Sequence, residues 1–167
     1  METAFSLGSN LGDRLDYLRQ ARDALGALPG ARLLAQSPVY ETEPVGVRPE
    51  HRDKPYLNAV VILACQRALP EVSNEIHAIE ARLGRRRQPD DRYAPRVIDI
   101  DMLYWGDTVC DTPELTLPHP QCLKRRFVCA PLADLRPALV LPGSDRSLRA
   151  ALAALPAEPA VRRIGVM

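Results

Sequence analysis

The sequence lacks the features of a secreted or membrane-spanning protein. No hydrophobic run approaches the ~20 residues that a membrane-spanning helix needs, and residues 1–7 show no basic region followed by a long apolar stretch. The four cysteines form no CxxC pair and have no histidine at zinc-finger spacing. We therefore expect no signal peptide, no disulfide framework and a reduced, cytoplasmic protein.

Lysine is scarce, and the chain carries little net charge. Lys54 and Lys124 are the only lysines, so nearly all basic residues are arginines, and the net charge is +1. A near-neutral chain with 46% apolar residues is neither disordered nor a general nucleic-acid binder. A length of 167 residues fits a single domain, 1–167, with one sizeable core, and we expect it to be a monomer.

Two acids interrupt an apolar run, and this is the most informative feature present. Asp99 and Asp101 lie within Val97–Leu103, which predicts a buried strand where bare carboxylates are costly. Residues two apart on a strand point to the same face, so both side chains can bind one cation or bridge two. The preceding loop, residues 85–96, carries five arginines, which favours a polyphosphate held with Mg²⁺. A structural salt-bridge network is the alternative.

Hydrophobic periodicity and turn residues predict the order of the elements. Strands are expected over 3–7, 33–40, 57–64 and 97–104, with one helix beginning after Asp13 and a second that begins at Pro70 and is ended by Gly84. This order predicts an α+β, ferredoxin-like plait with a β-α-β-β-α-β core, a mainly antiparallel sheet and helices packed on it. A C-terminal extension would add a short strand at 115–117 and helices over 127–135 and 147–155, the last being terminal. Loop 43–55 is long enough to be functional.

Three further motifs are ambiguous when each is taken alone. The turn at residues 8–12 could bind phosphate, but it lacks the spacing and the lysine of known phosphate loops, so a structural turn is favoured. Tyr56 and Asn58 share a strand face and suit a flat heterocycle, or else are a rim residue and a turn-binding amide. His119, between two prolines, is either a positioned ligand or structural. Phe127 is either a ligand-stacking residue or core.

In combination, these motifs resemble the hydroxymethyl-dihydropterin pyrophosphokinase family of folate synthesis. The match runs in order from about Phe5 to Leu135. The motifs that carry it are Gly8-Ser9-Asn10-Leu11-Gly12, Tyr40-x-Thr42-x-Pro44-x-Gly46, Tyr56-Leu57-Asn58-Ala59, Glu80 through Leu83-Gly84-Arg85-x-Arg87, Pro95-Arg96-x-Ile98-Asp99-Ile100-Asp101, Leu117-Pro118-His119-Pro120 and Arg125-Arg126-Phe127.

The resemblance implies an enzyme that moves pyrophosphate from ATP to the hydroxymethyl group of a reduced pterin and releases AMP. It implies two Mg²⁺ ions on the triphosphate, bound by Asp99 and Asp101, and a mobile catalytic loop that supplies Arg85 and Arg96. Asp101 is also the candidate base for the pterin hydroxyl. The implied nucleotide contacts are Arg87, Arg92, Thr116, His119 and Arg125. The implied pterin contacts are Thr42, Pro44, Val45, Tyr56, Asn58, Tyr93 and Phe127, with the pterin between Tyr56 and Phe127.

Three positions depart from the family pattern. Tyr93 stands where a tryptophan can occur, which keeps an aromatic residue there. Glu43 replaces a proline in the pterin-reading loop, where contacts are largely made by the backbone. Glu114 stands where a phosphate-contacting arginine can occur, so that role is not carried over to it.

Two functions of other classes compete with this interpretation. A non-catalytic nucleotide-sensing module would need the arginines but neither the two carboxylates nor the aromatic–amide pair. RNA binding through loop 85–96 is opposed by the acids within and after it and by the near-neutral charge. We therefore expect small-molecule substrates, with no nucleic-acid partner, no membrane partner and no covalent intermediate.

Overall fold

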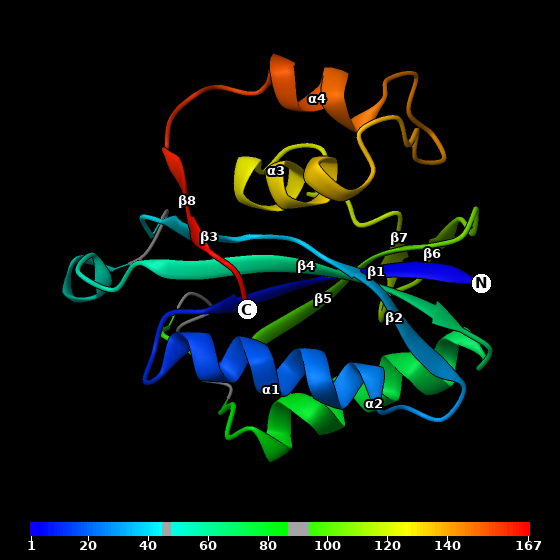
Figure 1. The fold of residues 1–167 in the computed structure, drawn as a ribbon, viewed down its shortest axis with the longest axis horizontal. Helices are drawn as coiled ribbons and strands as arrows, with labels where there is room; N and C mark the ends of the chain where they lie inside the picture. Colours follow the sequence, from blue (N-terminus) through cyan, green and yellow to red (C-terminus); the bar gives the residue numbers. More distant parts are fainter. Residues whose placement is uncertain (45–47, 87–93) are drawn as a thin grey trace.

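An antiparallel sheet of six strands forms the centre of the computed structural model, which describes residues 1–44, 48–86 and 94–167 (Figure 1). The helices and strands, with a single 3₁₀ turn at Pro49–His51, follow one another in the order β1 Glu2–Ser9, α1 Arg14–Gly26, β2 Ala31–Gln36, β3 Val39–Thr42, β4 Tyr56–Cys65, α2 Leu69–Arg82, β5 Asp99–Trp105, β6 Cys110–Asp111, β7 Thr116–Leu117, α3 Arg126–Leu135, α4 Leu148–Ala154 and β8 Val161–Gly165.

The strand order in the sheet is β5-β1-β4-β3-β8, and β2 pairs with the part of β4 that β3 leaves open. Every ladder in this sheet is antiparallel. β6 and β7 form a separate two-stranded ribbon. The predicted α+β plait is therefore confirmed.

Helices cover both faces of the sheet, which explains why the central strands are apolar on both sides. α1 and α2 lie on one face, and α3 and α4 lie on the other (Figure 1). Alternate residues of β4 point to opposite faces, so Val61 packs with α1 and α2 while Val60 packs with α3 and α4. The sheet thus separates two apolar clusters.

The two predicted helix boundaries follow from local chemistry. The Asp13 carboxylate accepts a hydrogen bond from the Asp16 N–H at 3.1 Å, which caps the start of α1. α2 ends just before Gly84, whose φ of +91° suits glycine better than any other residue. Within the ranges that the structure describes, no helix is long and apolar enough to span a bilayer.

The prediction of one strand over residues 33–40 is wrong. The Ser37 N–H donates to the Val60 oxygen, and the Ser37 hydroxyl accepts from the Val60 N–H, each at 2.9 Å. This side chain takes the place of a ladder bond, and Pro38 has no N–H to continue the ladder. The segment therefore divides into β2 and β3.

The chain does not end on the helix that was predicted over 147–155. β8 follows α4 and pairs with β3, with Val161 opposite Thr42 and Arg163 opposite Tyr40. Four of its five residues are exposed, so it has no apolar run that would mark it in the sequence. Pairing with an open sheet edge accounts for the strand.

Candidate active site

Polar side chains gather on the face of the sheet that carries α3, near the end of β1. Gly8 of β1 lies opposite Asn58 of β4 and opposite Asp99 of β5. Directly opposite residues share a face, and the same face carries Ala4 and Val60, which pack with α3. A Cβ on Gly8 would lie 3.4 Å from Asn58 Oδ1 and 3.9 Å from Asp99 Cβ. Glycine therefore keeps the space between these two side chains open.

Asp99 and Asp101 project from the same face of β5 but have different surroundings. Asp99 accepts hydrogen bonds from Arg85 Nη1 at 2.5 Å and from Arg96 Nη1 at 3.0 Å. In the described part of the chain, the Asp101 side chain makes no hydrogen bond and no ion pair. Burial, reinforced by the charges of Asp99 and Glu80, raises the pKa of Asp101 to about 7. The alternative interpretation, a salt-bridge network, therefore describes Asp99 and leaves Asp101 outside it.

The turn at residues 8–12 holds the arginine segment in place. The Arg96 N–H donates to Asn10 Oδ1 at 2.8 Å, and the Asn10 N–H donates to the Arg96 oxygen at 3.2 Å. Asn10 is buried, and its side-chain amide also donates to the Lys54 oxygen at 3.4 Å. These contacts support the structural interpretation of the turn, because its amide positions Arg96.

A buried carboxylate lies behind the two aspartates. Glu80 of α2 is 3% exposed, and its Oε1 atom accepts hydrogen bonds from Arg85 Nη1 and from the Ile100 N–H, the latter at 2.8 Å. Burial alone would lower the pKa of Arg85, but Asp99 and Glu80 raise it above its ordinary value. Arg85 therefore stays charged between two carboxylates.

Four of the seven residues predicted to bind the pterin lie where β3 and β4 pair or next to this pairing. Thr42 lies opposite Tyr56, and the Asn58 side-chain amide donates to the Thr42 hydroxyl at 2.9 Å. Asn58 and Thr42 are buried, whereas Pro44 and Tyr56 are half-buried. Burial raises the pKa of the Tyr56 hydroxyl. The structure thus brings these four residues to one end of the sheet.

Phe127 and Arg125 come from the start of α3. Phe127 is half-buried at the margin of the apolar cluster under α3, so the core interpretation of this residue holds in part. The Arg125 guanidinium lies 5.7 Å from the centre of the Phe127 ring, which is within the range of a cation–π contact. A stacking clamp with Tyr56 stays a prediction.

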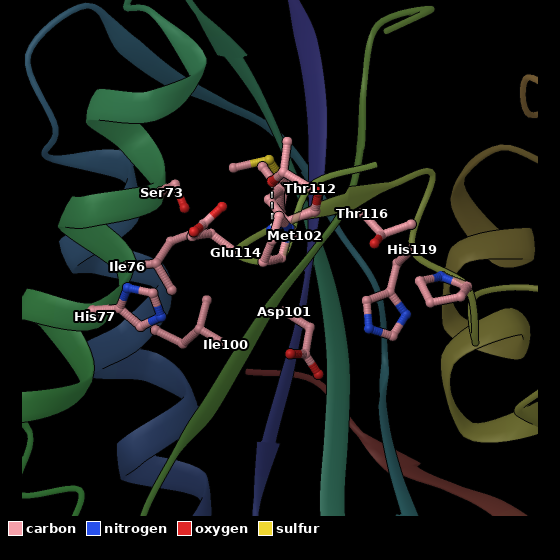
Figure 2. Close-up of a pocket in the computed structure, with 13 residues that line it drawn as sticks. Ser73, Ile76, His77, Ile100, Asp101, Met102, Thr112, Glu114, Thr116 and His119 are labelled. Atoms are coloured by element: carbon pink, nitrogen blue, oxygen red, sulfur yellow. Dashed lines mark hydrogen bonds between the residues drawn. The ribbon is translucent and has the colours of Figure 1, made fainter. Parts of the chain in front are cut away.

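A cavity of about 270 Å³ lies along the outer edge of β5. Figure 2 shows α2 on one side and the segment with Thr116 and His119 on the other, with Asp101 between them. The His119 N–H donates to the Leu103 oxygen at 2.8 Å, so this segment is fastened to β5. Burial, with the charge of Arg125 as the next cause, lowers the pKa of His119. A neutral imidazole therefore faces the cavity.

Four predicted site residues lie outside the described residues, and nothing structural is assigned to them: Val45, Arg87, Arg92 and Tyr93. Among the other predicted residues, Asp101, Thr116 and His119 line the cavity. Asn58 and Asp99 lie on either side of Gly8 near the end of β1, and Arg125 and Phe127 lie at the start of α3.

Sequence reasoning gave no role to Glu80 and Asn10. Glu80 follows Ile76 by four residues, so an acid occupies a position on the buried stripe of α2. That position was a usable signal, because a buried glutamate needs a partner. Asn10 offered no signal beyond its turn propensity, since its contact with Arg96 joins residues that are 86 apart.

Comparison with known proteins decides the family. The model of the 7,8-dihydro-6-hydroxymethylpterin-pyrophosphokinase (HPPK) family matches residues 4–137. The chain belongs to this family. A 2-amino-4-hydroxy-6-hydroxymethyldihydropteridine pyrophosphokinase of Pseudomonas aeruginosa is 40% identical over 153 residues, 92% of this chain and 91% of the relative. A protein of the same name from Porphyromonas gingivalis is 44% identical over 134 residues, 79% of this chain and 88% of the relative.

Solved structures agree on the fold. A crystal structure of Plasmodium falciparum HPPK-DHPS with pterin and p-hydroxybenzoate superposes with a TM-score of 0.69 at 15% identity. The match covers 91% of this chain but only 41% of the Plasmodium chain. Membership of the HPPK family makes this chain an enzyme, a pyrophosphokinase of folate biosynthesis that uses ATP. The nucleotide-sensing alternative is therefore excluded.

Proposed function

We propose that the chain transfers pyrophosphate from ATP to the hydroxymethyl group of 6-hydroxymethyl-7,8-dihydropterin, giving the pterin diphosphate and AMP. Family membership supports the reaction. The observation that carries its assignment to residues is the arrangement on β5, where Asp99 and Asp101 share a face and two arginines contact Asp99. The cavity that reaches Asp101 supplies room for a nucleotide beside these charges.

The chemistry of the donor set fits Mg²⁺. No group of three or more metal-binding side chains occurs among residues 1–44, 48–86 and 94–167. Mg²⁺ typically uses one or two carboxylates and takes its remaining ligands from substrate phosphates and water, so Asp99 and Asp101 suffice. Burial, with the charges of Asp99 and Glu80 as the next causes, raises the pKa of Asp101, and a cation bound beside the carboxylate would lower it again. When bound, two Mg²⁺ ions would orient the triphosphate and withdraw charge from it.

The arginines and Asp101 have separate roles in this proposal. Arg85 and Arg96 neutralise the negative charge that builds up on the transferred group, which requires positioning more than covalent chemistry. Asp101 accepts the proton of the pterin hydroxyl, since its carboxylate has no ion pair in the described ranges and faces the site.

The two ligands would occupy opposite sides of the aspartates. Thr116 and His119 line the cavity and contact the nucleotide, with Arg125 and the predicted contacts Arg87 and Arg92 meeting its phosphates. The pterin would stack between Tyr56 and Phe127. Asn58 and the backbone near Thr42 would read the edge of the ring, and Pro44, Val45 and Tyr93 are its further predicted contacts.

We also propose that residues 1–167 act as one domain, as a monomer, in the cytoplasm. The support is the six-stranded sheet, which shares its two apolar clusters with all four helices of the described chain, together with four free cysteines. Light scattering of the purified protein tests the monomer, and limited proteolysis tests the single domain.

The decisive experiment measures AMP. Purified protein is incubated with ATP and Mg²⁺, with and without 6-hydroxymethyl-7,8-dihydropterin, and the products are separated by ion-exchange chromatography. We expect AMP and the pterin diphosphate in equal amounts, and only with the pterin present. ADP as the product, or AMP formation that does not depend on the pterin, would refute the proposed function.

A further inference from the structure

Glu80 connects three parts of the candidate site through one carboxylate. Its Oε1 atom accepts from Arg85 Nη1 and also from the Ile100 N–H, which lies between the two aspartates. Its backbone oxygen accepts from the Arg85 N–H at 3.0 Å. The end of α2, the start of the arginine segment and β5 are thus joined at this residue.

The hydrogen bond from the Ile100 N–H does not by itself require a charge on Glu80. A glutamine at position 80 would still offer Oε1 to the Ile100 N–H, and it would remove the repulsion that Glu80 exerts on Asp101. Buried ion pairs are weak sources of stability, since desolvation offsets the attraction between the charges. A carboxylate, unlike an amide, forms a strong charge-assisted hydrogen bond with the Arg85 guanidinium.

The ion pair with Glu80 matters because Arg85 has two carboxylate partners, and one of them, Asp99, is an expected metal ligand. The Arg85 Nη1 atom lies 2.5 Å from Asp99 Oδ1 and also contacts Glu80. Once Asp99 binds a cation, its attraction for Arg85 is divided between two positive charges. Glu80 is 3% exposed and lies behind Asp99, so it keeps its hold on the arginine.

We propose that Glu80 is a positioning residue for pyrophosphate transfer: its buried carboxylate holds the Arg85 guanidinium beside the two aspartates when Asp99 is engaged by the metal–nucleotide complex. The inference rests on the proposed function. It concerns a residue that acts through Arg85, so removal of Arg85 must also remove the effect of Glu80 on turnover.

A kinetic double-mutant cycle tests this dependence. Glu80→Gln, which keeps an acceptor for Ile100, should lower kcat about tenfold while KM for ATP changes less than about threefold. In the Arg85→Ala background the same change should lower kcat by less than about twofold. Glu75→Gln is the matched control on α2, because Glu75 pairs with Arg67 at 3.5 Å outside the site, and it should leave kcat unchanged.

A stability cycle gives a second readout that needs neither ATP nor metal. Arg85→Ala leaves the Glu80 charge buried without this arginine, so Tm should fall by about 5 °C or more. Adding Glu80→Gln should recover at least about half of that loss, because no buried charge then remains at position 80.

The outcomes separate this inference from the proposed function. A wild-type protein that forms no AMP would overturn the proposed function. An active wild type in which Glu80→Gln lowers kcat by equal factors with and without Arg85 would overturn only the role of Glu80. Failure of Glu80→Gln to fold, or to recover stability in the Arg85→Ala protein, would also overturn it, since the charge would then serve the fold.

Discussion

Replacement of Asp101 by asparagine should separate the catalytic role of this carboxylate from any role in stability. Asp101 makes no ion pair in the described residues, and burial with two neighbouring carboxylates raises its pKa to about 7. Its charge therefore opposes folding at pH 8. We expect Asp101→Asn to leave the free energy of unfolding unchanged or to raise it by up to ~1 kcal/mol, a small value because the residue keeps contact with solvent at the cavity wall although neighbouring atoms pack around its carboxylate.

Asp99→Asn is the matched comparison, because asparagine removes the same charge from a residue that has partners. Asp99 contacts Arg85 and Arg96, whose side chains are 12% and 16% exposed. Loss of this carboxylate weakens two charge-assisted hydrogen bonds, although Arg85 keeps Glu80. We expect a loss of ~1–2 kcal/mol in the free energy of unfolding.

Two assays distinguish the variants. Urea unfolding without Mg²⁺ can be followed by the fluorescence of Trp105, the only tryptophan, which is buried at the end of β5. AMP formation should fall roughly 10³-fold in Asp101→Asn despite its intact stability, since a metal ligand and proton acceptor is lost. Retention of more than about a tenth of the turnover would refute this reasoning, as would a loss of activity that merely follows unfolding.

Two further predictions concern residues around the aspartates, and a third concerns an ion pair far from them. Arg96→Ala should lower kcat roughly 10²-fold or more with a smaller change in ATP affinity, because the Arg96 guanidinium would neutralise charge on the transferred group in the transition state. Full activity in steady-state assays would exclude this catalytic role of Arg96. Tyr56→Ala and Phe127→Ala should each weaken pterin binding about tenfold, at roughly 1–3 kcal/mol per stacked ring, while ATP affinity is kept. Calorimetric titration of the pterin with a non-hydrolysable ATP analogue measures this, and unchanged affinity would assign the ring to the core. The hydrogen bonds from Arg136 lower the pKa of Glu2 below its ordinary 4.5. This stabilisation is complete above pH 4.5 and lost as pH falls through the lower folded-state value, so Glu2→Gln should flatten the acid limb of a urea-midpoint profile; identical profiles would contradict the assignment.

Local chemistry made several elements predictable. Asp13 and Gly84 mark helix ends because capping and positive φ depend on residues within one turn. Residues 57–64 are predicted as a strand because an apolar run interrupted only by Asn58 reflects burial on both faces. Such signals depend on a few neighbouring residues, so the sequence alone predicts these helix ends and this strand.

Two other features, the break at Ser37 and strand β8, could not be predicted from local sequence. The break at Ser37 depends on a hydroxyl that replaces a ladder bond to Val60, 23 residues away. β8 depends on an open edge of β3 that exists only once the sheet has formed. Neither has a local pattern of its own.

For the candidate site, the order of the residues is enough to predict that Asp99 and Asp101 share a face, because the two-residue period of a strand is a local property. The charge environment of the two carboxylates, in contrast, arises from the packing of distant segments. The tertiary structure placed Glu80 behind Asp99, paired both arginines with Asp99 and left Asp101 without an ion pair among the described residues. The reason is physical: electrostatic interaction depends on distance and burial, and both arise only when α2, β1 and β5 pack together.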